Sequence, residues 1–147
     1  MKTIKILNKK ASFEYEFIQK YIAGIVLKGT EVKSLRKGKA SIKEAYCYFN
    51  GKELFIKGMH IAEHNVGEPH GTERDRKLLL TKKELKFIKE KIAIKGLTII
   101  PISVFFNEKQ YVKLEIAIAK GKKEYDKRES LKIKTLEREA KIQTFKK

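Results

Sequence analysis

The dipeptide Asn50-Gly51 constrains the fold of this chain more than any other local feature. Asn-Gly favours the tight turn of a two-residue β-hairpin, because both residues tolerate a positive φ angle. The flanking segments, Ile42 to Phe49 and Glu53 to Ile61, are rich in the apolar and aromatic residues typical of strands. The sequence therefore predicts an antiparallel hairpin within a β-rich domain.

Further strands are predicted where apolar residues alternate with polar ones between turn signals. A proline inside one of them, Pro101, suits an edge strand or a bulge. These predicted strands are Phe13 to Phe17, continuing through a bulge into Tyr21 to Leu27, then Leu97 to Phe106 and Tyr111 to Ala119.

Two helices are predicted between the strands. Thr30 is expected to cap a short helix that ends at Arg36. Thr81 and Glu84 form a capping box, which predicts the start of a longer helix. The apolar face of that second helix consists of Leu85, Ile88 and Ile92.

These elements predict a mainly β fold with about six short strands and two or three helices. Closing the sheet removes its exposed edges, so the pattern favours a small closed antiparallel β-barrel of the oligonucleotide-binding type. An open sheet covered by one helix is the alternative. A domain over residues 1–119 and a basic C-terminal tail over residues 120–147 complete the predicted organisation.

The charge balance indicates the partner. The chain has 35 Lys and Arg against 18 Asp and Glu, a formal net charge of +17. Such an excess favours binding to a polyanion, nucleic acid first and an anionic membrane surface second. No apolar run is long enough to span a membrane. The single cysteine, Cys47, is expected to be a buried structural thiol of a cytoplasmic protein.

The sequence does not favour an enzyme, a metal site or a cofactor. His60 and His64 have a metal-ligand spacing only in a helix, and in extended chain their rings would lie ~13 Å apart. Gly38-Lys39 and Gly121-Lys122 lack the upstream glycine of a phosphate-binding loop. The rival hypothesis is an enzyme on a nucleic-acid substrate, with a metal site formed by His60, His64 and His70.

Clusters of Lys and Arg are the remaining functional signal, and most of them flank turns or the ends of elements. Lysine meets phosphate as a point charge, whereas arginine can bind it through two parallel hydrogen bonds. The clusters predicted to contact RNA are Lys9 with Lys10, Lys33 with Arg36, Arg74 with Arg76 and Lys77, and Lys120 with Lys122 and Lys123.

The tail, residues 120–147, carries eleven Lys and Arg residues and five acidic residues. Ile133, Leu136 and Ala140 share one face of a helix, but this stripe is too thin to stabilise a helix alone in water. We expect the tail to be disordered when free and helical when bound to RNA. A basic helix lying on a membrane surface would need a stronger apolar stripe.

Several segments together resemble the small protein B family, the bacterial partner of transfer-messenger RNA (tmRNA) in trans-translation. They follow the order of the family over nearly the whole chain. The matching segments are Asn8-Lys9-Lys10-Ala11, Ala23-Gly24-Ile25-Val26-Leu27, Gly29-Thr30-Glu31-Val32-Lys33-Ser34-Leu35-Arg36-x-Gly38-Lys39, Met59-His60-Ile61, Arg76-Lys77-Leu78-Leu79-Leu80 and Gly121-Lys122-Lys123-x-Tyr125-Asp126-Lys127-Arg128.

The resemblance implies a cytoplasmic monomer that binds the tRNA-like domain of tmRNA and delivers it to stalled ribosomes. It also implies elongation factor Tu and alanyl-tRNA synthetase as partners through the tmRNA, and no catalysis. Family positions tied to RNA binding are matched by Asn8, Tyr15, Leu79 and Gly121. The family segment that contacts 16S rRNA in the decoding centre is matched by Tyr125, Asp126, Lys127 and Arg128.

The chain departs from the family pattern at three places. Ile22 stands where the family usually has Glu, which removes one polar RNA contact. The usual Asp-Pro-x-Arg-x-Arg becomes Thr72-Glu73-Arg74-Asp75-Arg76, and the tail beyond Arg128 is spaced differently. A generic binder of single-stranded or duplex RNA with the same body is the alternative function.

Overall fold

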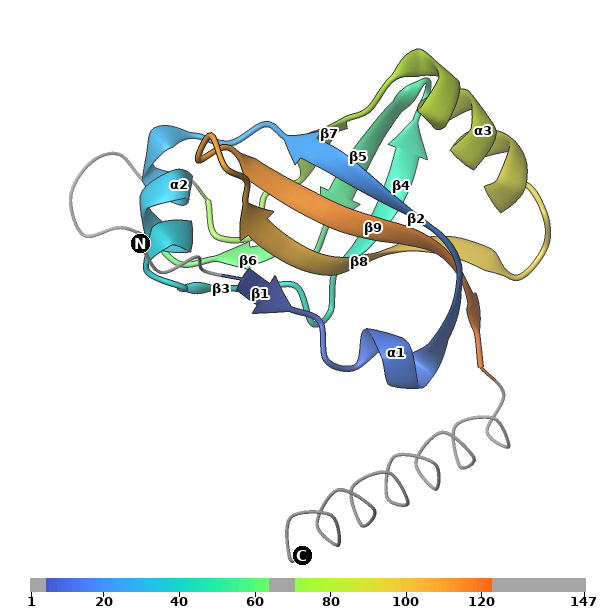
Figure 1. Cartoon of the computed structure of the whole chain (residues 1–147), viewed down its shortest axis with the longest axis horizontal. Helices are drawn as coiled ribbons and strands as arrows, with labels where there is room; N and C mark the ends of the chain where they lie inside the picture. Colours follow the sequence, from blue (N-terminus) through green and yellow to red (C-terminus); the bar gives the residue numbers. More distant parts are fainter. Residues whose placement is uncertain (1–4, 64–70, 123–147) are drawn as a thin grey trace, which may run out of the picture.

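The computed structural model describes residues 5–63 and 71–122 (Figure 1). Within these ranges the chain is mainly β, with nine strands and three helices. None of these helices is long and apolar enough to cross a membrane. The elements are β1 (Lys5–Leu7), α1 (Ala11–Glu14), β2 (Tyr15–Ile25), α2 (Gly29–Arg36), β3 (Ala40–Ser41), β4 (Tyr46–Asn50), β5 (Glu53–Lys57), β6 (His60–Ile61), β7 (Arg76–Leu79), α3 (Lys82–Ile92), β8 (Leu97–Phe106) and β9 (Val112–Gly121).

Six strands are paired in a ring, in the order β8, β4, β5, β7, β2 and β9, and β9 pairs again with β8. Neighbouring strands in the ring are antiparallel. β1 is hydrogen-bonded to β8 beside the ring, while β3 and β6 form a separate pair. The pairing therefore returns to its first strand, unlike the open sheet that was the alternative prediction.

The predicted hairpin is confirmed, but its two-residue turn is Gly51-Lys52 rather than Asn50-Gly51, and Asn50 is the last residue of β4. β4 and β5 pair from Asn50 with Glu53 onward, and Gly51 adopts φ 65°. β4 begins only at Tyr46, four residues later than predicted, because residues 42–45 form a turn before it. Cys47 is buried in β4, where burial raises the pKa of its thiol, so it is a structural thiol as predicted.

The predicted strand at Phe13 to Phe17 is wrong in its first half. Residues 11–14 form the short helix α1, in which the Lys10 carbonyl accepts hydrogen bonds from the N–H groups of Phe13 and Glu14. Ala11 anchors this turn against Ile100 of β8. β2 then starts at Tyr15 and contains the predicted bulge, between residues 17 and 19.

The longer predicted helix has the expected cap. In α3 the Thr81 hydroxyl accepts from the Glu84 N–H, and the Glu84 carboxylate accepts from the Thr81 N–H. Ile88, on the inward face of α3, is fully buried. In α2, however, the cap residue is Lys28 rather than Thr30, and the Glu31 carboxylate accepts from the Lys28 N–H.

β7 was not predicted, yet it links β5 to β2 and so completes the ring. Its inward residues are Arg76 and Leu78, both buried. A charged residue at an inward position breaks the apolar alternation by which strands are recognised. Pro101, by contrast, lies at a register shift in β8, as predicted.

Candidate nucleic-acid interface

Residues from both ends of the described chain meet around helix α1. Tyr15 pairs with Gly121, and the Lys122 N–H donates to the Glu14 carbonyl over 2.9 Å. The Asn8 amide donates to the Pro101 carbonyl over 3.0 Å. We call residues 8–15 and 120–122 the α1 corner; Figure 1 shows β9 ending beside α1. The corner thus brings together predicted RNA contacts that lie more than a hundred residues apart in sequence.

The α1 corner carries positive charge that the protein leaves largely unpaired. Lys9 and Lys120 are exposed and have no carboxylate partner among the described residues. Lys10 lies 3.8 Å from the exposed Glu44, a distance at which an ion pair in water is weak. Charges of this kind remain available to phosphate groups.

Asn8 lies at a small cavity in the α1 corner. Its Oδ1 atom is buried but accepts no hydrogen bond from the described residues. A small cavity of about 120 Å³ adjoins it, lined in part by Asn8, Tyr15 and Tyr46. Because an unpartnered buried oxygen is costly, a donor within this cavity, such as a water molecule, would stabilise it.

Leu79 lies elsewhere, on an outward position of β7. Half of its surface is exposed, and it packs beside Gly24 of β2, where an added Cβ would approach the Leu79 Cβ to 3.3 Å. Ile22, two residues before Gly24, is likewise exposed. This part of the surface is therefore apolar, and the position of the family's usual carboxylate carries an aliphatic side chain.

Helix α2 presents a second basic surface. Lys33 and Arg36 are exposed, while Leu35 is buried in the core. α1 and α2 lie well apart in Figure 1, so the basic clusters do not form one compact patch.

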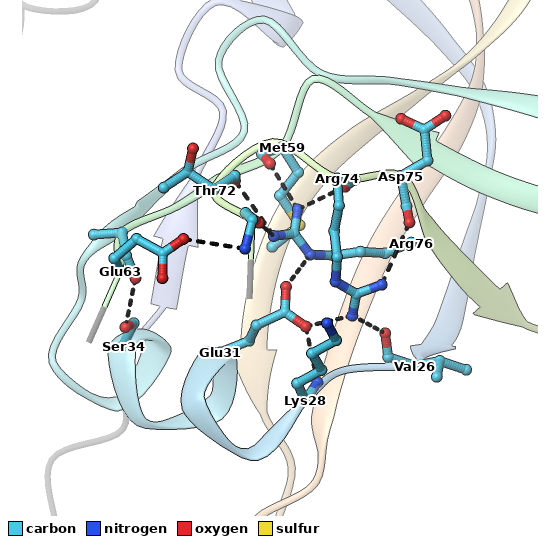
Figure 2. A network of polar contacts seen from close by, with 12 residues as sticks. Val26, Lys28, Glu31, Ser34, Met59, Glu63, Thr72, Arg74, Asp75 and Arg76 are labelled. Atoms are coloured by element: carbon cyan, nitrogen blue, oxygen red, sulfur yellow. Dashed lines mark hydrogen bonds and ion pairs between the residues drawn. The ribbon is translucent and has the colours of Figure 1, made fainter. Parts of the chain in front are cut away.

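A network of charged side chains connects Glu31, on the inward face of α2, with Arg74 and Arg76 (Figure 2). The side chain of Arg76 is fully buried, and its Nε donates to a carboxylate oxygen of Glu31, which is also fully buried. The remaining Arg76 nitrogens donate to backbone carbonyls of Met59, Gly71, Thr72 and Arg74. A buried guanidinium is stable only when paired in this way.

Arg74 shares the same carboxylate from the solvent side. It donates to Glu31 and, at 3.5 Å, to the Val26 carbonyl, and its side chain is 29% exposed. Burial pushes the pKa of Glu31 up, but hydrogen bonds from Arg74, the Lys28 N–H and Arg76 outweigh that effect and lower it below its usual value. Glu31 is therefore ionised and holds α2 against the start of β7 and the residues just before it.

The network corrects the predicted RNA-contact set. A fully buried Arg76 has no surface to offer a phosphate, so its predicted RNA contact does not fit the structure. Lys77 lies 3.3 Å from Glu53 but stays partly exposed. Glu31 was missed, although it lies four residues before the core residue Leu35, on the same face of α2. That spacing could have identified it as an inward-facing charge.

Other predicted residues are outside the described ranges. Lys123, the segment Tyr125 to Arg128, His64 and His70 fall there, so their placement stays a prediction. His60 is an exposed residue of β6, 3.8 Å from Glu73. Over residues 5–63 and 71–122 no three His, Cys, Asp or Glu side chains are grouped to hold a metal ion.

Comparisons with known proteins cover nearly all of the chain. A family model described as SmpB protein matches residues 5–146. An SsrA-binding protein of Phocaeicola vulgatus is 57% identical over 138 residues, which is 92% of either chain. One of Cytophaga hutchinsonii is 57% identical and covers 95% of this chain and 92% of its own. One of Rickettsia canadensis is 54% identical and covers 90% and 88%.

A solved structure shares the fold. It is described as "tmRNA-SmpB: a journey to the center of the bacterial ribosome" and superposes with a TM-score of 0.68 at 38% identity. The match covers 88% of this chain and 94% of that one. Sequence and structure thus agree over the same length of chain.

Proposed function

The chain belongs to the SmpB protein family, and from that premise we propose that it binds tmRNA and delivers it to stalled ribosomes for trans-translation. Relatives more than 50% identical are named for binding SsrA. The similar solved structure is described by tmRNA and the bacterial ribosome together. The protein acts in this role as a binding protein of the cytoplasm, where ribosomes are found.

The α1 corner is the observation that carries the proposal. It joins Asn8, Tyr15 and Gly121, three positions that match the family's RNA-binding positions, in one exposed and positively charged surface. The lysines neutralise phosphates, and the Tyr15 ring, partly exposed beside the Asn8 cavity, offers a face to a base. This combination suits folded RNA with an unpaired nucleotide.

The ring of strands supports a small closed barrel of the oligonucleotide-binding type as the RNA-binding body. The RNA contacts we propose lie mostly outside the ring's core, on exposed or partly exposed side chains. They are Asn8, Lys9, Lys10, Tyr15, Lys33, Arg36, Arg74, Lys77, Leu79, Lys120, Gly121, Lys122 and Lys123.

The tail is assigned a separate task. β9 includes Lys120 and Gly121, so the body extends two residues beyond the predicted boundary before the tail begins. We propose that Tyr125 to Arg128 contact 16S rRNA in the decoding centre. We also propose that elongation factor Tu and alanyl-tRNA synthetase act through the tmRNA.

Tyr125→Ala should then leave tmRNA affinity nearly unchanged and block peptide tagging on stalled ribosomes. A large loss of tmRNA affinity in that variant would contradict the division of tasks.

The test of the function is a competition binding experiment at near-physiological salt. The tRNA-like half of tmRNA competes against an ordinary tRNA and against an unrelated hairpin of equal length. We expect strong preference for the tRNA-like half, because shape rather than charge alone is recognised. Equal affinities that fall together as salt rises would identify a generic RNA-binding protein instead.

A further inference from the structure

A groove away from the α1 corner lies between helix α3 and the hairpin of β4 and β5. Its volume is about 600 Å³, in the range of cavities that bind small molecules or anchoring side chains. None of the proposed RNA contacts lines it. Its lining residues are Phe49, Lys52, Lys82, Leu85, Lys86 and Lys89.

A contact through Lys89 joins the two walls of the groove. The Lys89 ammonium, on α3, donates to the Gly51 carbonyl at the hairpin turn over 2.8 Å. The same ammonium lies 5.8 Å from the centre of the Phe49 ring, a cation–π distance. These contacts link the two walls in the unbound protein.

The rim of the groove is positively charged. Lys52, Lys82 and Lys86 are exposed, and no described carboxylate pairs with them. Glu84, two residues from both Lys82 and Lys86, is held by the helix cap at Thr81, and Glu53, next to Lys52, lies 3.3 Å from Lys77 instead. A partner for this rim must bring negative charge.

The floor of the groove selects among anionic partners. Phe49 and Leu85 have no hydrogen-bonding atoms in their side chains, so a nucleobase inserted between them would lose hydrogen bonds to water without replacement. The Phe49 ring, on which a base could stack, already has the Lys89 ammonium over it. An apolar side chain would instead gain from burial. The chain's own residues 123–147 are predominantly basic and would be repelled by the rim.

From the apolar floor and the lysine rim we propose that the α3 groove binds an acidic peptide segment of a partner protein through a bulky apolar anchor. The anchor enters between Phe49 and Leu85, and flanking carboxylates pair with Lys82 and Lys86. This surface does not depend on the proposed RNA function, because its residues are separate from the α1 corner.

The experiment uses the full chain and a fluorescent acidic peptide rich in Glu with one central Phe. The groove variant is K82E/K86E, and the matched control is K83E/K91E, which makes the same charge change on the same helix outside the groove lining. Fluorescence anisotropy at near-physiological salt gives the dissociation constants. Each variant is also tested for binding to the tRNA-like RNA.

We expect the groove variant to bind the peptide about tenfold more weakly than the control variant does. Replacing the central Phe of the peptide with Ser should cost the wild-type protein a loss of similar size. Equal weakening by both variants, or no effect of the Phe, would overturn the proposal, since net charge alone would explain binding. A loss of RNA affinity confined to the groove variant, with peptide affinity unchanged, would overturn it in favour of an RNA surface.

Discussion

The α1 corner and the Glu31 network both gather cationic side chains from segments distant in sequence, but in opposite environments. The corner joins residues 8–15 to residues 120–122 and leaves Lys9 and Lys120 in water without carboxylates. The network joins Glu31 to Arg74 and Arg76 and encloses Arg76 completely.

The difference separates the charge that stabilises the fold from the charge that remains for binding. A buried guanidinium must be compensated by nearby acceptors, and removing one member leaves the others unpaired at high cost. An exposed lysine is hydrated, contributes little to stability and can exchange its water for phosphate. Substitutions in the network should therefore affect folding, and substitutions in the corner should affect RNA affinity.

Arg76→Met should have the largest effect on stability. The substitution leaves Glu31 with one arginine fewer and strips hydrogen bonds from four backbone carbonyls. We expect the free energy of unfolding in urea to fall by about 4 kcal/mol. The adjacent partly exposed residue supplies the control: Lys77→Met should cost less than about 1 kcal/mol, the usual range for an exposed ion pair. Similar losses in the free energy of unfolding for both variants would contradict the distinction between buried charges that stabilise the fold and exposed charges that do not.

Glu31→Gln should cost somewhat less, about 3 kcal/mol at neutral pH, because the amide still accepts one hydrogen bond but cannot compensate two guanidinium groups. The effect has a defined pH dependence. The folded-state pKa of Glu31 is lowered below its usual 4.5. Its contribution is therefore fully present above pH 4.5 and is lost as the pH falls through the folded-state pKa. Unfolding curves of wild type and variant should converge on acidification; a constant gap down to the lowest accessible pH would contradict this assignment.

Arg74→Met tests the residue that lies between the two environments. Its guanidinium bonds the buried carboxylate, yet its side chain is 29% exposed. We expect a stability loss of about 1 kcal/mol, since Arg76 still pairs with Glu31, and a loss of RNA affinity of about threefold. A loss of RNA affinity without any loss of stability would mean that Arg74, like the lysines of the α1 corner, serves only RNA binding. A loss of stability without any loss of RNA affinity would mean that Arg74, like Arg76, serves only the fold.

Local signals in the sequence predicted those parts of the fold that depend on local chemistry. Asn50-Gly51 predicted its hairpin and Thr81 with Glu84 predicted its helix cap, because neighbouring atoms determine both. β7 was missed because its inward Arg76 is compensated by a residue 45 positions away, which no local pattern reveals. The composition gives the number of arginines and lysines, but only the three-dimensional structure shows which of these side chains are buried and which are exposed.

The candidate site was predictable to a similar extent. Positions that match the family's RNA-binding residues identified Asn8, Tyr15 and Gly121. Their proximity was not predictable, because it results from the long-range pairing of β2 with β9. The α3 groove had no sequence signal, because Phe49 and the α3 lysines meet only through tertiary packing.

Lys9→Ala combined with Lys120→Ala should have the smallest effect on stability and a clear effect on binding. Both side chains are exposed and lack carboxylate partners among the described residues, so the free energy of unfolding should change by less than about 0.5 kcal/mol. If each lysine neutralises one phosphate, tmRNA affinity at near-physiological salt should fall about tenfold, and the slope of log affinity against log salt should decrease by about 2. The control, Lys57→Ala with Lys109→Ala, removes the same charge from exposed positions outside the corner. Equal losses in both variants would mean that the RNA responds to net charge rather than to the α1 corner, and the contrast between the two regions would then concern stability alone.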